Sequence, residues 1–169
     1  MTLDARPVTR DTVLALIDLS VRDDQRDLVT ANVKTLAEAA YEPGAVVWGL
    51  WDGAVPVGLM AMVDPEGVRL HGPLLVPDAA YLWRLMIAAN HQGKGYGAQA
   101  LRLAIASARR WGAGHLVTGV NDVPHGNRGF YERHGFRSSG VIEEGDLLLV
   151  LDLSAAEDPR ARTADRPTM

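Results

Sequence analysis

Two stretches near the N-terminus carry apolar residues at helical spacing. A first helix is expected to run to Leu19, with Thr9 or Asp11 as its N-cap, behind a short edge strand over Arg6–Thr9. The segment 23–44 then places apolar residues three or four positions apart and stops at a Pro-Gly pair, which predicts a second helix. Its apolar positions are Leu28, Val29, Val33, Leu36 and Ala40.

Continuous apolar runs predict strands in the middle of the chain. The runs Ala45–Trp51 and Val55–Val63 flank Asp52-Gly53, a dipeptide typical of hairpin turns, so these two strands should pair antiparallel. A connection rich in glycine and proline follows. The run Ala80–Ala88 is apolar on both faces, which is typical of a central strand.

The C-terminal part alternates helices and strands before the pattern stops. The predicted elements are a helix over 96–111, a strand over 115–120, a short helix that ends at Gly135, and a strand over 147–153. From Ser154 the chain is polar and aperiodic, so residues 154–169 are expected to form a disordered tail. Residues 1–153 then form a single α/β domain with a mixed, mostly antiparallel sheet flanked by helices.

The composition fits one soluble globular domain. The chain has 169 residues, 47% hydrophobic and 22% charged, and a formal net charge of −4. This acidic balance argues against nucleic-acid binding. The sequence has neither an apolar run of about 20 residues nor the start of a secretory signal, so we expect a cytoplasmic protein that does not cross a membrane. The absence of cysteine excludes disulfides, thiolate metal sites and a cysteine nucleophile.

Three glycines at alternate positions, Gly93, Gly95 and Gly97, lie between the central strand and the helix over 96–111. Backbone N–H groups that enter a helix form a cradle for anions, and glycine lets a phosphate approach because it has no Cβ. Lys94 adds a mobile positive charge. The pattern favours a phosphate or pyrophosphate site, with a tight turn that binds nothing as the alternative.

Two other phosphate motifs fit this loop less well. Lys94 is followed by Gly95 and not by Ser or Thr, so the loop is not a P-loop. The spacing Gly93-x-Gly95-x-x-Ala98 satisfies the loose dinucleotide fingerprint. That fingerprint belongs to a repeating parallel βαβ series, however, and the sequence predicts only one such unit.

Two motifs on consecutive strand–helix units belong together. They are Gln92-x-x-Gly95-x-Gly97 and the sequence GFYERHGF over Gly129–Phe136. The first resembles the pyrophosphate loop, and the second the aromatic helix, of the GNAT superfamily of acetyl-CoA-dependent N-acyltransferases. The resemblance covers roughly residues 5–153. It implies the GNAT fold, acetyl-CoA as co-substrate and no metal.

The resemblance implies a cofactor role for each matching residue. The pantetheine arm would meet backbone groups of Leu85, Met86 and Ile87. The pyrophosphate would be held by Gln92, Gly93, Lys94, Gly95, Tyr96, Gly97 and Ala98. Many members carry an asparagine seven residues before the helix tyrosine, where this sequence has Pro124. Asn127 or Asn121 would have to supply that contact.

Tyr131 occupies the position where the superfamily places its general acid. The resemblance implies that its hydroxyl lies near the cofactor sulfur, where a phenol can protonate a departing thiolate. A core aromatic in an amphipathic helix is the alternative role. Because the chain has no cysteine, an acyl-thioenzyme is impossible, and the amine should attack acetyl-CoA directly in a ternary complex.

The general base is not evident from the sequence. The candidates are Glu38, Glu42, His71 and Asp24, each of which is also compatible with a solvated structural role. A water chain is a further alternative. The other histidines, His91, His115, His125 and His134, show no metal-ligand spacing.

The acceptor is expected to be a small-molecule amine. Within the superfamily, the early acidic helix together with the sequence YLWRLMIAANHQGKGYG is similar to bacterial diamine (spermidine/spermine) acetyltransferases. This resemblance implies a polyamine or diamine acceptor, attracted by Asp24, Asp27, Glu38 and Glu42. By residue type, Trp48, Trp51 and Trp83 fit either the core or an aromatic wall of the acceptor pocket. Other amines remain open, namely an aminoglycoside-type antibiotic, an amino acid, or a protein N-terminus or lysine. A non-catalytic acyl-CoA-binding regulator and a homodimer also remain open.

Overall fold

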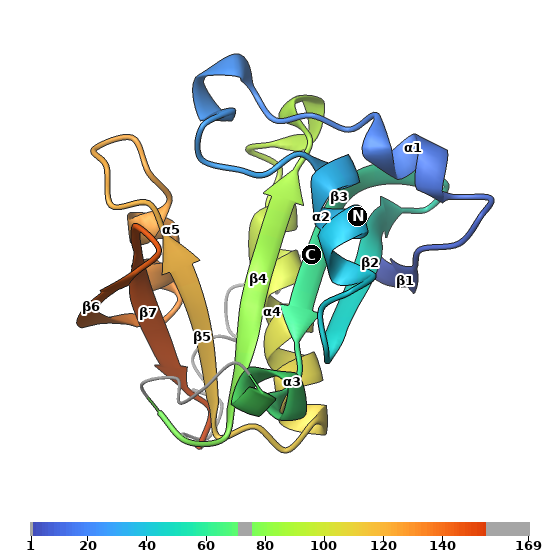
Figure 1. Ribbon diagram of the computed structural model, residues 1–169. Coiled ribbons are helices and arrows are strands. Elements are labelled where there is room, and N and C mark those ends of the chain that lie inside the picture. The colour runs from blue at the N-terminus through green and yellow to red at the C-terminus, as the bar shows by residue number, and fades with distance from the viewer. Residues whose placement is uncertain (1, 71–75, 155–169) are drawn as a thin grey trace, which may run out of the picture.

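The computed structural model of the protein describes residues 2–70 and 76–154 (Figure 1). Its elements are β1 (Leu3–Pro7), α1 (Val13–Ile17), the 3-10 turn η1 (Asp23–Gln25), α2 (Asn32–Ala39), β2 (Ala45–Asp52), β3 (Val55–Val63), α3 (Pro65–Leu70), β4 (Ala79–Ile87), the 3-10 turn η2 (Ala89–His91), α4 (Tyr96–Arg110), β5 (His115–Val120), α5 (Arg128–Arg133), β6 (Arg137–Glu143) and β7 (Asp146–Asp152).

The strands form one seven-stranded sheet in the order β1-β2-β3-β4-β5-β7-β6. In the part of the chain that the structure describes, every neighbouring pair is antiparallel except β4 and β5. These two strands pair only from Ala79 to Leu82 and from His115 to Thr118, and beyond that point they diverge (Figure 1). The predicted mixed, mostly antiparallel sheet is confirmed, and its two halves separate at one end.

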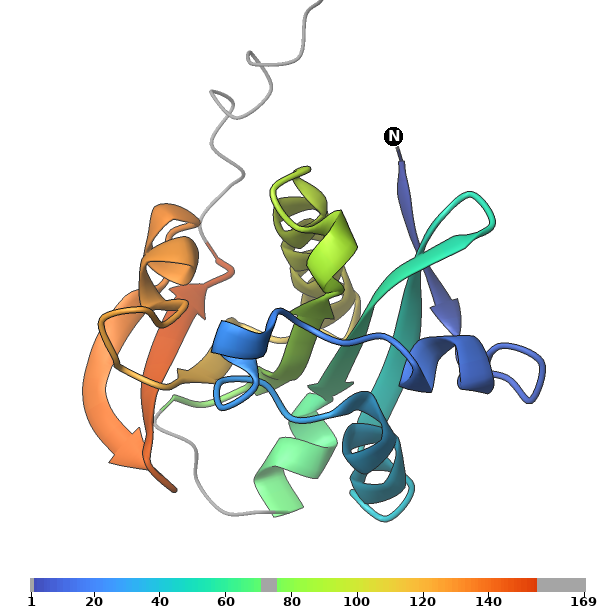
Figure 2. The same cartoon turned by 90° about the horizontal axis from the view of Figure 1, so that it is seen from above.

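Helices cover both faces of the sheet (Figure 2). On one face, α4 and α5 bury Leu101, Ala104 and Tyr131 against the strands in the largest hydrophobic cluster. On the other face, α1 contributes Leu16, which is fully buried together with Leu59. The β4 strand lies between the two layers at the centre of the sheet, as its apolar character predicts.

The prediction of one helix over 23–44 is wrong. The helix α2 begins only at Asn32, and the chain before it forms the short turn η1. The side chain of Asn32 is 2% exposed and donates a hydrogen bond of 2.8 Å to the Leu16 carbonyl, which fixes the start of α2 on α1. Leu28 and Val29, which follow the helical spacing, instead line cavities beside β4.

Other boundaries also differ. The edge strand lies over Leu3–Pro7 and not over Arg6–Thr9, because the Thr9 N–H already bonds to the Thr12 hydroxyl in the turn that enters α1. Two elements were not predicted, namely α3, within a Gly/Pro-rich connection, and β6, whose residues are nearly all exposed and therefore carry no apolar signal. The predicted tail lies outside the described residues except for Ser154, and His71 lies outside them as well.

Candidate active site

The glycine loop joins β4 to α4 with an open backbone. Gly93 and Gly95 adopt positive φ angles of 73° and 82°, a conformation that favours glycine. No atom lies within 4 Å of the position that a Cβ would take on either residue. At Gly97 that position is 3.5 Å from the nearest atom, on the Phe130 ring. Gly95 caps a helix of 15 residues, so the N-terminus of α4 faces open space at this loop.

A first cavity of about 410 Å³ lies between this loop, β4, α5 and the segment before α2. The predicted cofactor residues that line it are Leu85, Met86, Ile87, Gln92, Gly93, Gly95, Gly97, Ala98, Asn127 and Tyr131. Lys94 and Tyr96 do not line it. The Lys94 ammonium donates to the Asn90 carbonyl, and Tyr96 is 3% exposed and donates its hydroxyl proton to Asp52 across the core.

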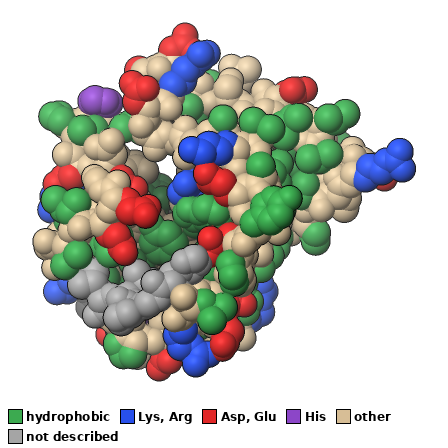
Figure 3. All heavy atoms as spheres, viewed as in Figure 1, with side chains coloured by type: hydrophobic (Ala, Val, Ile, Leu, Met, Phe, Trp, Pro, Cys, Tyr) green, Lys and Arg blue, Asp and Glu red, His purple; other side chains and the backbone are tan. Residues whose placement is uncertain are grey.

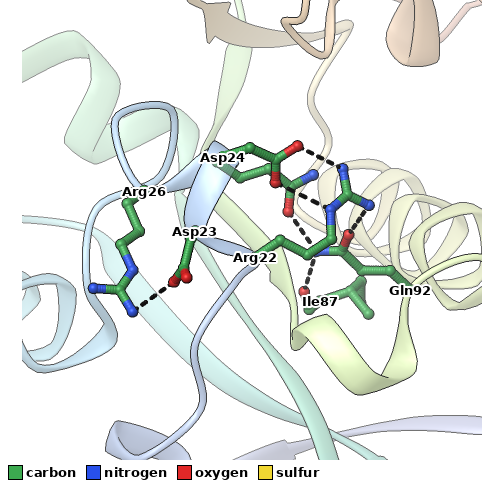
Figure 4. Close-up of polar contacts among 7 residues, drawn as sticks. Arg22, Asp23, Asp24, Arg26, Ile87 and Gln92 are labelled. Carbon is green, nitrogen blue, oxygen red and sulfur yellow. Dashed lines mark hydrogen bonds and ion pairs between the residues drawn. The ribbon is translucent and has the colours of Figure 1, made fainter.

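Gln92 connects the loop to the segment before α2 (Figure 4). Its Nε2 donates to the Ile87 carbonyl at 2.9 Å and to Gln25 Oε1 at 2.7 Å, and its Oε1 accepts a bond of 2.9 Å from Arg22. Arg22 in turn forms an ion pair with Asp24 at 3.1 Å. The Gln92 side chain therefore orders the loop through contacts with three neighbours, and Asp24 serves this structural network.

Tyr131 lies in the wall between two cavities. It is 4% exposed, and it lines both the first cavity and a second cavity of about 280 Å³. Burial raises the pKa of Tyr131 to about 12, with a smaller increase from nearby Tyr81, while a hydrogen bond with Thr118 opposes both. The hydroxyl therefore keeps its proton at neutral pH and can donate it.

The second cavity occupies the gap where β4 and β5 separate. Its lining includes Trp83 and Arg84 from β4, Asn121 after β5, and Asp146 at the start of β7. A third cavity of about 400 Å³ continues past Arg84 toward the β6–β7 turn. Figure 3 shows acidic side chains at the rim of the hollow between β4 and the C-terminal strands.

A comparison with protein families identifies the chain. The family model described as "Acetyltransferase (GNAT) family" matches residues 13–136. This chain belongs to the GNAT acetyltransferase family. It is therefore an acyltransferase, as the two sequence motifs predict. No curated protein sequence matches the chain.

Solved structures share the fold of this GNAT enzyme. The PaiA N-acetyltransferase of Thermoplasma acidophilum, in complex with coenzyme A, has a TM-score of 0.64 at 13% identity and covers 90% of this chain and 99% of its own. An acetyltransferase of Thermus thermophilus has a TM-score of 0.63 at 24% identity, covering 90% and 97%. A GNAT acetyltransferase of Elizabethkingia anophelis with acetyl-CoA bound has a TM-score of 0.61 at 14% identity, covering 89% and 98%.

The predicted acceptor residues of this GNAT enzyme do not all meet. Trp83 and Glu42 line the third cavity. Glu38 forms ion pairs of 3.7 Å with Arg84 and 3.5 Å with Lys34, next to these cavities. Trp48 lies elsewhere. It packs toward α4, and its ring stacks on Trp111 at a centroid distance of 6.0 Å.

Several groups that line the second and third cavities were not among the predicted site residues. They are Tyr81 and Arg84 on β4, Gly119 on β5, and Asp146 on β7. Gly119 is the sequence feature that could have indicated this region, because a glycine inside a strand often marks a close approach of other groups. Among residues 2–70 and 76–154, no group of three or more His, Asp or Glu side chains is arranged to hold a metal ion. None of the helices in the same residues has the length and apolar character needed to cross a membrane.

Proposed function

We propose that this protein transfers the acetyl group of acetyl-CoA to a primary amine of a small cationic acceptor, a polyamine or diamine. The amine attacks directly in a ternary complex, and Tyr131 is the general acid. The observation that carries this proposal is the position of Tyr131, which lines both the glycine-lined cavity and the cavity between β4 and β5. A hydroxyl at this boundary is placed to protonate the thiolate that remains in the first cavity when the acetyl group passes to an amine in the second.

The first cavity fits acetyl-CoA. The bare glycine positions of the loop and the N-terminus of α4 suit a pyrophosphate. Leu85, Met86 and Ile87 pair with β3 on one side, and on their other side β5 has already diverged. Their outward backbone groups would hold the pantetheine arm, and Asn127 would take the place of the family asparagine at Pro124. When bound, acetyl-CoA supplies the thioester carbon that the amine attacks.

Gln92→Ala is expected to weaken acetyl-CoA binding about tenfold, because the variant loses the three hydrogen bonds that order the loop and each contributes roughly 0.5–1.5 kcal/mol. Isothermal titration calorimetry measures this change. Gln25→Ala removes only one of those bonds and should have a smaller effect. Equal affinities for wild type and Gln92→Ala would mean that the network does not shape the cofactor loop.

The third cavity suits the cationic tail of an acceptor. The described residues that line it include one cation, Arg84, and four carboxylates, Glu42, Glu143, Glu144 and Asp146. Trp83 adds an aromatic face, and the Arg84 guanidinium already lies over its ring at 4.9 Å from the centroid. Carboxylates with an aromatic wall are the groups that bind alkylammonium ions.

A panel of amines tests the acceptor, with release of free thiol as the measurement. Spermidine should give a higher kcat/KM than a simple alkylamine of similar length, because its distal ammonium groups meet the acidic cavity. The advantage should shrink severalfold between ~0.05 M and ~0.5 M salt, since exposed charges are screened. Glu42→Gln should lower it, while Asp4→Asn, which removes a carboxylate ion-paired to Arg6 on β1, should not. If the ratio of kcat/KM for spermidine to that for the alkylamine changes neither with salt nor in Glu42→Gln, the polyamine proposal is contradicted.

An amino acid is the second candidate acceptor. The Nε atom of Arg84 is buried and has no hydrogen-bond partner among the described residues, which suits a substrate carboxylate. Amino acids in the same panel distinguish the two candidates. If no amine of the panel leads to thiol release, the result would favour a non-catalytic acyl-CoA-binding protein.

A further inference from the structure

Gly119 lies inside β5, where two polar side chains approach the bare backbone. A Cβ at this residue would be 2.9 Å from the Tyr81 hydroxyl and 3.3 Å from Asp146 Oδ2. Both oxygen atoms therefore lie close to the same point, in space that any other residue would fill. The glycine brings together one side chain from β4 and one from β7, although these strands are not neighbours in the sheet.

Asp146 differs from the other carboxylates on this side of the molecule. It is partly buried and lines both the second and the third cavity. Within residues 2–70 and 76–154, no Lys or Arg forms an ion pair with it. Glu38 is paired with Arg84 and Asp24 with Arg22, while Asp27, the other carboxylate of the second cavity, is exposed.

We propose that Asp146 is the catalytic base of this enzyme and accepts the proton of the acceptor ammonium in the cavity between β4 and β5. The inference rests on the proposed function and names the group that the sequence analysis did not find. Asp146 and Tyr131 line the same cavity, so the base and the acid face one acceptor site.

The protons and bonds balance in this scheme. The ammonium gives one proton to the Asp146 carboxylate, and the free amine attacks the thioester carbon. A C–N bond forms and the C–S bond breaks. Tyr131 protonates the thiolate and is reprotonated by the second proton of the attacking nitrogen. Asp146 then releases its proton to water, which leaves an amide, a thiol and one proton.

The groups around Asp146 come from several elements. The groups that line a cavity together with Asp146 are Tyr81 and Arg84 on β4, Tyr131 on α5, Glu143 on β6, Glu144 in the β6–β7 turn, Glu42 after α2, and Arg26 and Asp27 directly after η1. Burial raises the pKa of Tyr81 to about 12, and the charge of Asp146 contributes to that rise. Tyr81 therefore stays a neutral hydroxyl beside the Asp146 carboxylate. The cation that β4 contributes to these cavities is Arg84.

The test is the pH dependence of Asp146→Asn with spermidine, or with the best amine of the panel. Without a base, only acceptor that is already deprotonated can react. We expect kcat to fall by ~10²–10⁴-fold near neutral pH. The loss should shrink about tenfold for each pH unit toward the amine pKa, which is about 10 for an alkylamine. Trifluoroethylamine, which is mostly neutral at neutral pH, should show little loss. Asp146→Glu should restore activity.

Asp152→Asn is the matched control, because it makes the same change on the exposed C-terminal end of β7. It should retain the wild-type pH profile. Melting temperatures check that each variant folds, and calorimetry of spermidine with the CoA-bound protein should show weaker binding to Asp146→Asn. A loss that is the same at every pH and for both amines would overturn the base role. A wild type that releases no thiol with any amine would overturn the proposed function itself, and the base with it.

Discussion

Replacing Tyr131 with phenylalanine is expected to lower kcat by ~10²–10⁴-fold while the affinity for acetyl-CoA stays within about twofold of wild type. The ring packs in the core between Phe130 and Phe136, and phenylalanine keeps that packing. The substitution removes only the hydroxyl. Thr118 still donates its own proton to the Leu82 carbonyl at 2.9 Å, so no buried donor is left without a partner.

Steady-state kinetics and calorimetry on the same preparation separate the two quantities. Tyr41→Phe is the matched control, because Tyr41 is 90% exposed and the substitution removes the same atom. Because the pKa of Tyr131 is raised to about 12, the wild type should lose the acid only above pH ~11. A Tyr131→Phe variant with wild-type kcat would mean that water or another group protonates the thiolate.

Gly97→Asp is expected to weaken acetyl-CoA binding by ~100-fold or more without unfolding the protein. Gly97 lies in the first turn of α4, where a carboxylate suits the helix dipole and any residue other than proline has a better helix propensity than glycine. A Cβ there would make an ordinary contact with the Phe130 ring at 3.5 Å. The fold should therefore accept the change, while the new charge repels the pyrophosphate by several kcal/mol.

Gly97→Asn separates charge from size. Asparagine has almost the same shape as aspartate, so a much smaller loss of affinity in Gly97→Asn would attribute the effect to charge. Calorimetry with acetyl-CoA gives the affinities, and thermal unfolding gives the stability. If Gly97→Asp binds acetyl-CoA as tightly as wild type, the loop is not the pyrophosphate site.

The sequence predicted the lining of the first cavity better than that of the second and third. The glycine loop is local, since Gly93 and Gly95 depend on backbone conformations that a few consecutive residues dictate. Tyr131 follows from a short motif on one helix. These features need no knowledge of which strands are neighbours, and the residues matched by the family model include both motifs.

The lining of the second and third cavities depends on distant contacts. Tyr81, Gly119 and Asp146 are far apart in the chain and meet only because β7 inserts between β5 and β6. Trp48 was expected beside the acceptor on its residue type alone. Its position in β2 directs it toward α4 and Trp111, and no spacing in the sequence fixes which face of a fully apolar strand a tryptophan takes.

The short parallel contact between β4 and β5 also determines how the molecule opens. Among the described residues, only the pairs from Ala79–His115 to Leu82–Thr118 join the strands β1–β4 to the strands β5–β7 by backbone hydrogen bonds. Each half keeps its own ladder when these few bonds break, so we expect amide hydrogen exchange to be faster at this contact than inside the two halves. A ligand that spans the gap holds the two halves together and raises the free energy of opening. Its binding should therefore slow amide exchange even in strands that it does not contact.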